Sequence, residues 1–397
     1  MKIQSLTHTG LGRAEDGTMV PRTLPLEEVE VTDDGVRIVS PSADRVSPPC
    51  RHYKSCGGCA MQHASDAFVA AWKASTVERA LSAQGIEATI ADTITSPIKS
   101  RRRAKLAGRR TKKGTLVGFH ARASDTLVEV PDCQLLAPEL IATLPALNAL
   151  TAFAASRKAE VGMTVSLSVD GPDVHIQTEK ELTTDLRVDL AQWANQYGIA
   201  RLVWVDEPVV TIHPPRQDFG GSLVVPPPGA FLQATKHGEK ALQDAVNAIV
   251  GDADKVVDLF AGSGTFTLPL ARKASVHAVE GVREMMDALD RGWRSTGGLH
   301  RVSVETRDLF RRPLLPDELN EFDAIVIDPP RAGAEAQVAE IAESKVATVA
   351  MVSCNPVTFA RDAKTLIDAG FTLGPVTVVD QFRWSHHTEV VAAFTRN

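Results

Sequence analysis

The chain has 397 residues, with 44% hydrophobic and 23% charged side chains and a formal net charge of −6 at pH 7. This length predicts two or three domains, and the hydrophobic content excludes a chain too polar to fold. The N-terminus, MKIQSLTHTG, lacks an apolar signal-peptide core, and no run of about 18 apolar residues occurs. We therefore expect a cytoplasmic protein without a membrane-spanning helix.

Residues 1–46 carry three short β-like runs, MVPRTL, EEVEVT and GVRIVS, which are separated by Gly and Asp turns. Short strands with turns between them are typical of small antiparallel folds. We predict a small barrel-like segment here, which ends before the first cysteine.

Three of the five cysteines follow in one tight loop, CRHYKSCGGC, and a fourth lies in the Pro-bounded loop PDCQLL. Two glycines inside the first loop let the backbone wrap closely around a bound group. Disulfides are rare in cytosolic chains, so the thiols predict a metal or cluster site formed by Cys50, Cys56, Cys59 and Cys133. The spacing fits both zinc and an iron–sulfur cluster, because each accepts four thiolates.

The next segment combines an amphipathic helix over residues 66–83 with strands and helices from about residue 90 to 225, including the strands VSLSVD, DVHIQTE and ARLVWV. Nine of the 43 Lys and Arg lie between Lys99 and Lys113, a stretch without acids, which leaves 34 against the 49 Asp and Glu elsewhere. An acidic body with one dense basic segment can steer a polyanion to one face. The segment is therefore either a solvated charged loop or an RNA contact.

A Pro-rich turn, PPPG at residues 226–229, marks a boundary, and beyond it strands and helices alternate. The predicted strands are KVVDLF, SVHAVE, FDAIVID and VATVAMVS, and the helices between them include VREMMDALDRGWRS and AEAQVAEIAES. This alternation predicts a doubly wound α/β domain, whose ligands bind at the carboxyl ends of the parallel strands.

The first of these strand ends is followed by a glycine-rich turn, DLFAGSGTFTLPLA. Gly262 and Gly264 allow a tight turn into a helix with the backbone close to a ligand. The turn lacks the Lys and Ser/Thr of a phosphate loop, and Thr267 stands at the third glycine of a dinucleotide fingerprint. The pattern instead fits an S-adenosylmethionine site. Glu280 ends the second strand, where an acid can bind ribose hydroxyls.

Two further strand ends carry unusual residues. IDPPRAG stiffens the loop after Asp328 with two prolines, and its Arg331 suits a phosphate. VSCNPVTFARD places Cys354 just before a helix, whose N-terminus can lower the pKa of a thiol and make it nucleophilic. Near the C-terminus, DQFRWSHHTEVVAAF places Glu389 at the start of a predicted last strand.

Together, SCNPVTFARD, IDPPRAG, DLFAGSGTFTLPLA, HHTEVV and the cysteine set resemble the RNA uracil-5-methyltransferase family over nearly the whole chain. Within it, the iron–sulfur branch acting on 23S ribosomal RNA is the most similar. The resemblance implies a short TRAM-like β segment at 1–46, a central RNA-binding domain with a [4Fe–4S] cluster at 47–229, and a Rossmann-like methyltransferase domain at 230–397.

The resemblance also implies roles for single residues. Cys354 corresponds to the nucleophile and Glu389 to the base, while the four cysteines correspond to the cluster ligands. The positions that correspond to cofactor contacts are Gln233, Phe260, Gly262, Thr265, Glu280, Asp308 and Asp328. This chain departs from the family pattern at Thr235 and Thr265, where Asn is usual, and at Arg383, where Pro is usual.

The implied reaction explains these residue types. Uracil C5 is a weak nucleophile until a thiolate adds to C6, and the C5 proton must then leave to a base. The uridine has to be flipped out of RNA structure to reach such a pocket. We expect a monomer acting on 23S rRNA, with transfer RNA as the alternative substrate. A DNA cytosine-5-methyltransferase lacks support, because its Pro-Cys motif is absent. A non-catalytic iron–sulfur RNA-binding protein would not need the Cys354 and Glu389 pair.

Overall fold

The computed structural model describes residues 1–32 and 35–396. The N-terminal strands form two small antiparallel sheets: β1 (Ile3–Leu6), β2 (Gly12–Ala14) and β3 (Met19–Val20) in one, and β4 (Glu28–Thr32) with β5 (Gly35–Ser40) in the other. Within the described residues, one isolated bridge between Lys2 and Glu28 links the two sheets, and they do not close into a barrel. The predicted runs became β3, β4 and β5, whereas β1 and β2 were not predicted.

A seven-stranded sheet in the order β13-β12-β11-β10-β7-β8-β9 forms the central part of the chain. Its strands are β7 (Arg103–Thr111), β8 (Gly114–His120), β9 (Leu127–Val128), β10 (Val161–Ser168), β11 (Gly171–Gln177), β12 (Arg201–Trp204) and β13 (Glu207–Thr211). Pairing is antiparallel except between β11 and β12, which α4 connects. The helices of this part are α2 (Pro138–Ala142), α3 (Leu144–Ala154) and α4 (Thr184–Tyr197), and they share one apolar core with the sheet.

The second large sheet has nine strands in the order β18-β17-β16-β19-β20-β23-β22-β6, with β21 paired to β23. The strands are β6 (Ile94–Thr95), β16 (Lys255–Leu259), β17 (Ser275–Glu280), β18 (Val302–Thr306), β19 (Ala324–Ile327), β20 (Thr348–Ser353), β21 (Thr372–Leu373), β22 (Thr377–Asp380) and β23 (Glu389–Thr395). β16 to β20 are parallel, and β23 runs antiparallel to β20. The order reverses between β16 and β19, which creates the crevice in which such sheets bind ligands.

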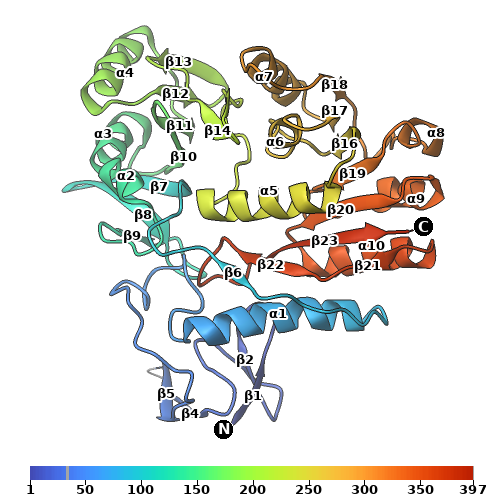
Figure 1. Cartoon of the computed structure of the whole chain (residues 1–397). Helices are drawn as coiled ribbons and strands as arrows, with labels where there is room; N and C mark the ends of the chain where they lie inside the picture. The colour runs from blue at the N-terminus through green and yellow to red at the C-terminus, as the bar shows by residue number, and fades with distance from the viewer. Residues whose placement is uncertain (33–34, 397) are drawn as a thin grey trace.

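Helices cover both faces of this sheet (Figure 1). One face packs against α5 (Lys236–Val250), α6 (Thr267–Leu270) and α7 (Arg283–Arg294), and the other against α8 (Pro316–Leu319), α9 (Glu335–Glu343) and α10 (Pro356–Asp368). A hairpin of β14 (Gln217–Phe219) and β15 (Ser222–Val224) packs on α7. The predicted alternation of strands and helices is therefore confirmed as a doubly wound α/β sheet. No helix in the described residues is both long and apolar enough to cross a membrane.

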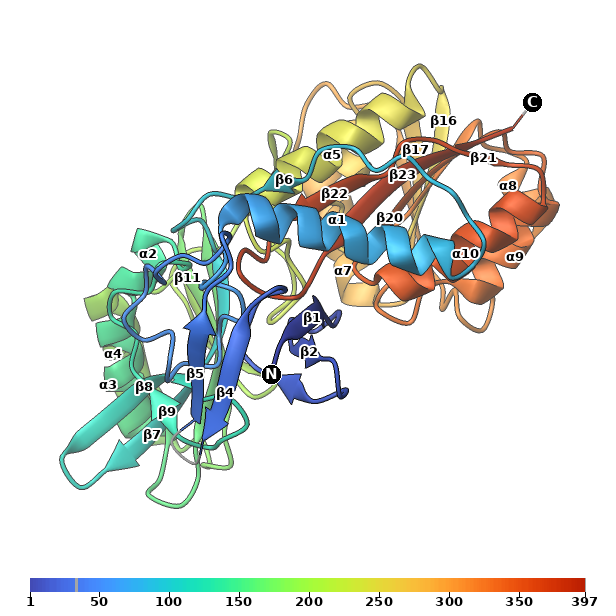
Figure 2. The ribbon, with the colours of Figure 1, turned by 90° about the horizontal axis from the view of Figure 1, so that it is seen from below.

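The helix predicted over residues 66–83 is α1 (Asp66–Ser82), and it lies on the second sheet rather than on the central one (Figure 2). Ser65 caps it by accepting a hydrogen bond from the N–H of Phe68 at 3.2 Å. Val77 and Leu81 are fully buried in the same core as α10, and β6 extends the sheet by pairing with β22. The predicted domain boundary at residue 229 thus leaves out α1 and β6, which pack with the second sheet. The sequence could not show this, because an apolar helix face does not specify which surface will cover it.

The basic segment from Lys99 to Lys113 is divided between buried and exposed cations. Arg102 is only 4% exposed, pairs with the buried Glu239 of α5 and donates through Nε to the carbonyl of Gln233 at 3.0 Å. Arg101 lies over the ring of Phe382, and Arg103 donates to the carbonyl of Gly229. These three arginines therefore join the central sheet to the second sheet. The exposed cations of the hairpin are Lys105, Arg110, Lys112 and Lys113.

We predict that Arg102→Met lowers the free energy of unfolding by about 3 kcal/mol, because the substitution leaves Glu239 buried without its main partner. Urea unfolding followed by circular dichroism measures this change. Arg110→Met, which alters an exposed arginine of the same segment, serves as the control and should leave the unfolding midpoint unchanged. Equal stability of the two variants would show that Arg102 does not hold the sheets together.

Candidate active site

One cavity of about 480 Å³ lies at the carboxyl ends of β16, β17, β19 and β20. All nine residues predicted as catalytic or cofactor-binding line it: Gln233, Phe260, Gly262, Thr265, Glu280, Asp308, Asp328, Cys354 and Glu389. They come from seven separate segments of the chain. The structure thus brings the predicted set together at the point where the strand order reverses.

The glycine turn after β16 is shaped by backbone conformation and by Glu280. Gly262 has φ +57°, a left-handed conformation, and a Cβ on Gly264 would lie 2.4 Å from a methyl of Leu289. The Glu280 carboxylate accepts hydrogen bonds from the N–H of Gly262 at 3.2 Å and of Val282 at 3.1 Å. Glu280 therefore holds the turn in place while lining the cavity.

Sequence reasoning missed the apolar walls of the cavity. Phe310 lies with its ring centroid 5.4 Å from that of Phe260, at an angle of 55°. Phe231 and Met285 line the same cavity. A single Phe or Met in a sequence does not differ from a core residue, so only the fold reveals these positions. The aromatic pair and Met285 give the cavity a flat apolar part suited to an adenine-sized ring.

Gln233 and Gln381 link the cavity wall to the strand end that precedes Glu389. The Gln381 amide donates to Oε1 of Gln233 at 2.5 Å and accepts from the N–H of Ala234 at 2.7 Å. Thr235, which replaces the family Asn, caps α5 by accepting from the N–H of Gly238 at 2.9 Å. The replacement therefore serves as a helix cap.

Buried carboxyl groups dominate the electrostatics of the cavity. Burial of Glu389, which is 2% exposed, and then the charge of the neighbouring Asp328 raise its pKa to about 8. Burial and the charge of Asp258 likewise raise the pKa of Asp328 to about 7. Asp258 itself accepts from the Thr267 hydroxyl at 2.5 Å. A carboxyl group with a pKa near neutrality is suited to take up a proton.

Cys354 lies between β20 and α10, beside Glu389. Ser353 pairs with Val390 in the antiparallel register, so the next residue, Cys354, lies next to Glu389 across the two strands. We predicted a lowered thiol pKa from the nearby helix N-terminus, and this is wrong: burial, followed by the charges of Glu389 and Asp328, raises the pKa of Cys354 to about 11. The desolvation of the thiol and the adjacent acids outweigh the dipole of α10.

A second cavity, also of about 480 Å³, is lined by Cys354 as well. Cys354 and Arg331 line both cavities. The outer cavity adds residues from three other regions, namely His8 and Thr9 from the N-terminus, Thr76 and Arg79 from α1, and His386 and His387 from the segment before Glu389. Arg331 donates to the His387 ring at 2.8 Å, and burial lowers the pKa of His387 to about 4, so this ring is neutral at pH 7. The thiol is therefore reachable from outside through a mixed cationic and aromatic entrance.

The four other cysteines line a third cavity, of about 280 Å³. Backbone N–H groups point at two of the thiols: Gly58 donates to Cys56 at 3.3 Å and Leu135 to Cys133 at 3.5 Å. Burial raises the pKa of Cys56, Cys59 and Cys133, and the neighbouring thiols raise each further. Among the described residues, no group of three or more His, Cys, Asp and Glu is arranged to hold a metal ion. The four predicted cysteines therefore line one cavity, but they do not converge on the position of a single metal ion.

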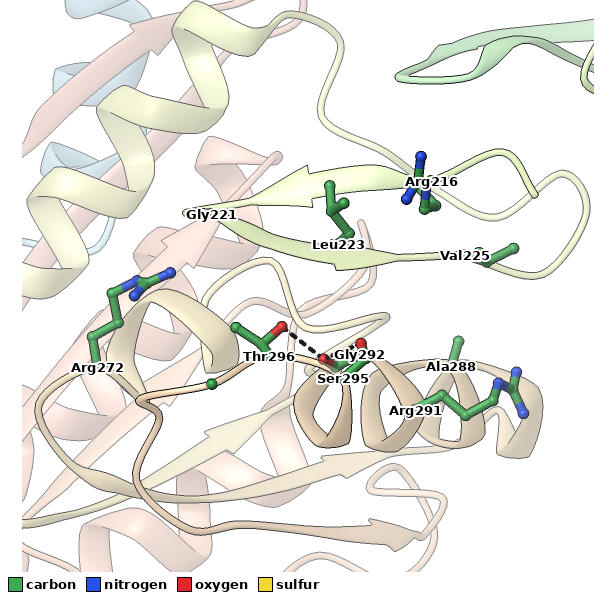
Figure 3. Close-up of a pocket in the computed structure, with 11 residues that line it drawn as sticks. Arg216, Gly221, Leu223, Val225, Arg272, Ala288, Arg291, Gly292, Ser295 and Thr296 are labelled. Carbon is green, nitrogen blue, oxygen red and sulfur yellow. Dashed lines mark hydrogen bonds between the residues drawn. The ribbon is translucent and has the colours of Figure 1, made fainter. Parts of the chain in front are cut away.

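A larger cavity, of about 700 Å³, lies between the β14–β15 hairpin and α7 and shares no lining residue with the other three (Figure 3). Two of its arginines serve the fold. Arg216 is paired with Asp170, and Arg272 donates to the carbonyl of Gly220 at 2.9 Å. Since neither a nucleophile nor a buried acid lines it, we place the active site at the strand ends instead.

A solved structure shares the fold of this chain. The structure of the Pyrococcus abyssi tRNA (uracil-54, C5)-methyltransferase in complex with S-adenosyl-L-homocysteine superposes with a TM-score of 0.76, covering 99% of this chain and 98% of that one at 21% identity. The superposition and the strand order show that the chain has the class I methyltransferase fold.

Sequence relatives identify the family. A family model described as tRNA (Uracil-5-)-methyltransferase matches residues 295–397. An RNA methyltransferase of Caulobacter vibrioides, named as uncharacterized, is 44% identical over 98% of the chain and 97% of its own length. The 23S rRNA (uracil(1939)-C(5))-methyltransferase RlmD of Shewanella halifaxensis is 32% identical over 99% of the chain and 95% of its own length. The chain belongs to the RNA (uracil-5-)-methyltransferase family, which confirms the resemblance predicted from its motifs.

Proposed function

We propose that the protein transfers a methyl group from S-adenosylmethionine to C5 of a uridine in RNA, with Cys354 as nucleophile and Glu389 as base. The observation that carries the proposal is the single cavity lined by Cys354, Glu389 and all seven predicted cofactor residues. A thiol and a buried acid side by side at the carboxyl edge of a class I sheet fit this reaction.

The inner cavity supports a cofactor site. Glu280 ends β17, where an acid binds ribose hydroxyls, and the Phe260–Phe310 pair offers a surface for the adenine ring. Gly262 and Thr265 would bring backbone close to the ligand, and Asp308 and the buried Gln233 would add polar contacts. Bound there, S-adenosylmethionine supplies an electrophilic methyl group and, through its sulfonium, a positive charge beside the acids.

The residues of the chain perform four steps. The Cys354 thiolate adds to C6 of the uracil, and the electrons of the C5–C6 double bond move toward C5 and O4. C5 then bonds to the methyl group, whose bond to sulfur breaks. Glu389 takes the C5 proton, and the double bond reforms as the C6–S bond to Cys354 breaks. The raised pKa of Glu389 suits it to hold this proton.

The outer cavity supports an approach path for a flipped nucleotide. It shares Cys354 with the cofactor cavity, and Arg331 and Arg79 provide cations for phosphates. The exposed hairpin cations Lys105, Arg110, Lys112 and Lys113 are placed to add phosphate contacts. In this proposal, residues 1–46 and 47–229 hold RNA, and residues 230–397, with α1 and β6 packed against them, carry the chemistry.

Ribosomal RNA is the proposed substrate. The relative named for 23S rRNA aligns with the chain over nearly its full length at 32% identity, which supports this choice. The alternative, a transfer RNA uridine, is supported by the name of the family model.

We also propose that Cys50, Cys56, Cys59 and Cys133 hold a [4Fe–4S] cluster. The four thiols line one cavity of about 280 Å³. A single zinc ion would need every sulfur within about 2.3 Å, so a cavity of this volume suits a larger group better. The N–H groups of Gly58 and Leu135 provide the hydrogen bonds to sulfur that such clusters receive. The cluster takes no part in the methyl transfer, and its proposed role is structural.

The roles of Cys354 and Glu389 predict different defects. Cys354→Ala should bind RNA yet lose methylation by about three orders of magnitude or more and form no covalent adduct. Glu389→Gln should still add to uracil and transfer the methyl group, but should release product poorly. A denaturing gel with methyl-labelled cofactor should therefore show a labelled protein–RNA band for Glu389→Gln alone. Normal turnover by Cys354→Ala would exclude it as nucleophile, and normal turnover by Glu389→Gln would move the base to Asp328.

The cluster proposal predicts about four iron atoms and four sulfides per chain in anaerobically purified protein. Cys56→Ser should lose most of the iron and unfold at lower temperature. Cys354→Ser, which removes a thiol outside the cysteine cavity, is the matched control and should keep its iron. One zinc per chain and no iron in the wild-type protein would contradict the assignment.

A further inference from the structure

The segment Gln381–Thr388 connects β22 to β23 and leads directly into Glu389; we call it the base loop. It carries Gln381, which hydrogen-bonds to the cavity residue Gln233, and also His386 and His387, which line the outer cavity with Cys354. The conformation of this loop therefore sets where the proposed base and two walls of the substrate path lie. A charged side chain with no exposed surface, from the N-terminal half of the chain, contacts both ends of this loop.

That side chain is Lys73, in the middle of α1. It has no exposed surface, and neither does its partner, Asp380. Its ammonium donates to the Asp380 carboxylate at 2.5 Å, to the Phe382 carbonyl at 3.3 Å and to the His387 carbonyl at 2.6 Å. The three acceptors lie at the two ends of the base loop, so one ammonium group ties the start of the loop to its end.

The burial of this ion pair calls for a reason other than stability. Removing an ammonium and a carboxylate from water costs several kcal/mol, and replacing a buried pair by apolar side chains is often neutral or stabilising. α1 already packs on α10 through Val77 and Leu81, so its docking does not depend on a charge. The three donor bonds of Lys73 are instead all directed to the base loop and the residue before it.

Lys73 shares the ends of the loop with other contacts: Gln381 bonds to Gln233 and Ala234 at the start, and Arg331 donates to the His387 ring near the end. The N–H groups of Ala60 and Met61, just after the cysteine loop, donate to the Trp384 carbonyl at 2.8 and 3.0 Å. Arg383, which stands where the family has Pro, pairs with Asp66 of α1 and donates to the Ser96 carbonyl at 3.0 Å. These contacts hold the middle of the loop, whereas the turn into Glu389 is held at the His387 carbonyl.

We propose that Lys73 is a positioning residue for the reaction: its ammonium closes the base loop and so fixes Glu389 against the substrate carbon. This inference rests on the proposed role of Glu389. Lys73 does not touch the reacting atoms. It acts through Asp380 and the two carbonyls, and its loss should affect proton removal from C5 more than thiol addition at C6.

Lys73→Met tests the proposal, together with Lys73→Met/Asp380→Asn, which also removes the carboxylate that the single change leaves buried and unpaired. Glu78→Gln, on the exposed face of α1, is the control. We expect Lys73→Met to lower kcat by about 10- to 100-fold, with methylated adduct accumulating as in Glu389→Gln and with cofactor affinity retained. The double variant should recover thermal stability without recovering kcat.

A pH profile separates positioning from a general loss of structure. The charged groups that face Glu389 are Asp328 and Arg331 after β19, Cys354 after β20, and Lys73 of α1. Lys73 lowers the pKa of Glu389, and the base acts when deprotonated, so adduct release should rise with pH in the wild-type protein. In Lys73→Met this rise should move to higher pH, whereas in Glu78→Gln it should not move.

All rates are compared at a temperature at which circular dichroism shows each variant folded. The ratio of adduct formation to adduct release then distinguishes a positioning defect from a loss of structure. Unchanged turnover and an unchanged pH profile in Lys73→Met would overturn the proposal. Recovery of kcat in the double variant would also overturn it, by showing that only the unpaired Asp380 mattered. Absence of any adduct or methyluridine with the wild-type protein would instead contradict the function proposed for the site itself.

Discussion

The desolvation of carboxyl groups at one edge of a sheet is the constraint on which the active site depends. Glu389, Asp328 and Asp258 lie within a few residues of strand ends whose neighbours are almost all apolar. Burial raises the pKa of each toward neutrality, to about 7 for both aspartates and to about 8 for Glu389. Desolvation, and after it the charges of Glu389 and Asp328, likewise raise the pKa of Cys354 to about 11. Without bound cofactor, burial and the neighbouring acids therefore disfavour the ionised forms of both Cys354 and Glu389.

That arrangement gives the cofactor an electrostatic role as well as a chemical one. A sulfonium cation in the inner cavity would favour the thiolate and the carboxylate together, since an opposite charge nearby stabilises the ionised form of an acid. Under the proposed function, Cys354 thus becomes reactive when the methyl donor is present. Arg331, which lines both cavities, is the cation of the chain that already acts in this direction, because it lowers the pKa of Cys354 and of Glu389.

Motifs at strand ends could be predicted from the sequence because their residues are chemically unusual where they occur. A Cys after an apolar strand, a D-P-P-R turn and a glycine turn each stand out, and the fold places all of them on one cavity. The position of α1 could not be predicted, because an apolar stripe at helical spacing does not indicate which sheet or helix will pack against it. Arg102 was misjudged for a related reason: within a run of basic residues, only the structure separates the buried arginine paired with Glu239 from the exposed ones. The apolar walls formed by Phe231, Met285 and Phe310 look like ordinary core residues in sequence.

The most direct test of the central claim is to incubate the protein with deuteromethyl-labelled S-adenosylmethionine and 23S rRNA from cells that lack the protein. Transfer RNA from the same cells is treated in parallel, and both are digested to nucleosides for mass spectrometry. The account predicts 5-methyluridine carrying three deuterium atoms from 23S rRNA, at one position, and none from transfer RNA. Label in 5-methyluridine of transfer RNA alone would keep the chemistry and change the substrate. Label on any atom other than uracil C5, or no label in either RNA, would contradict the account.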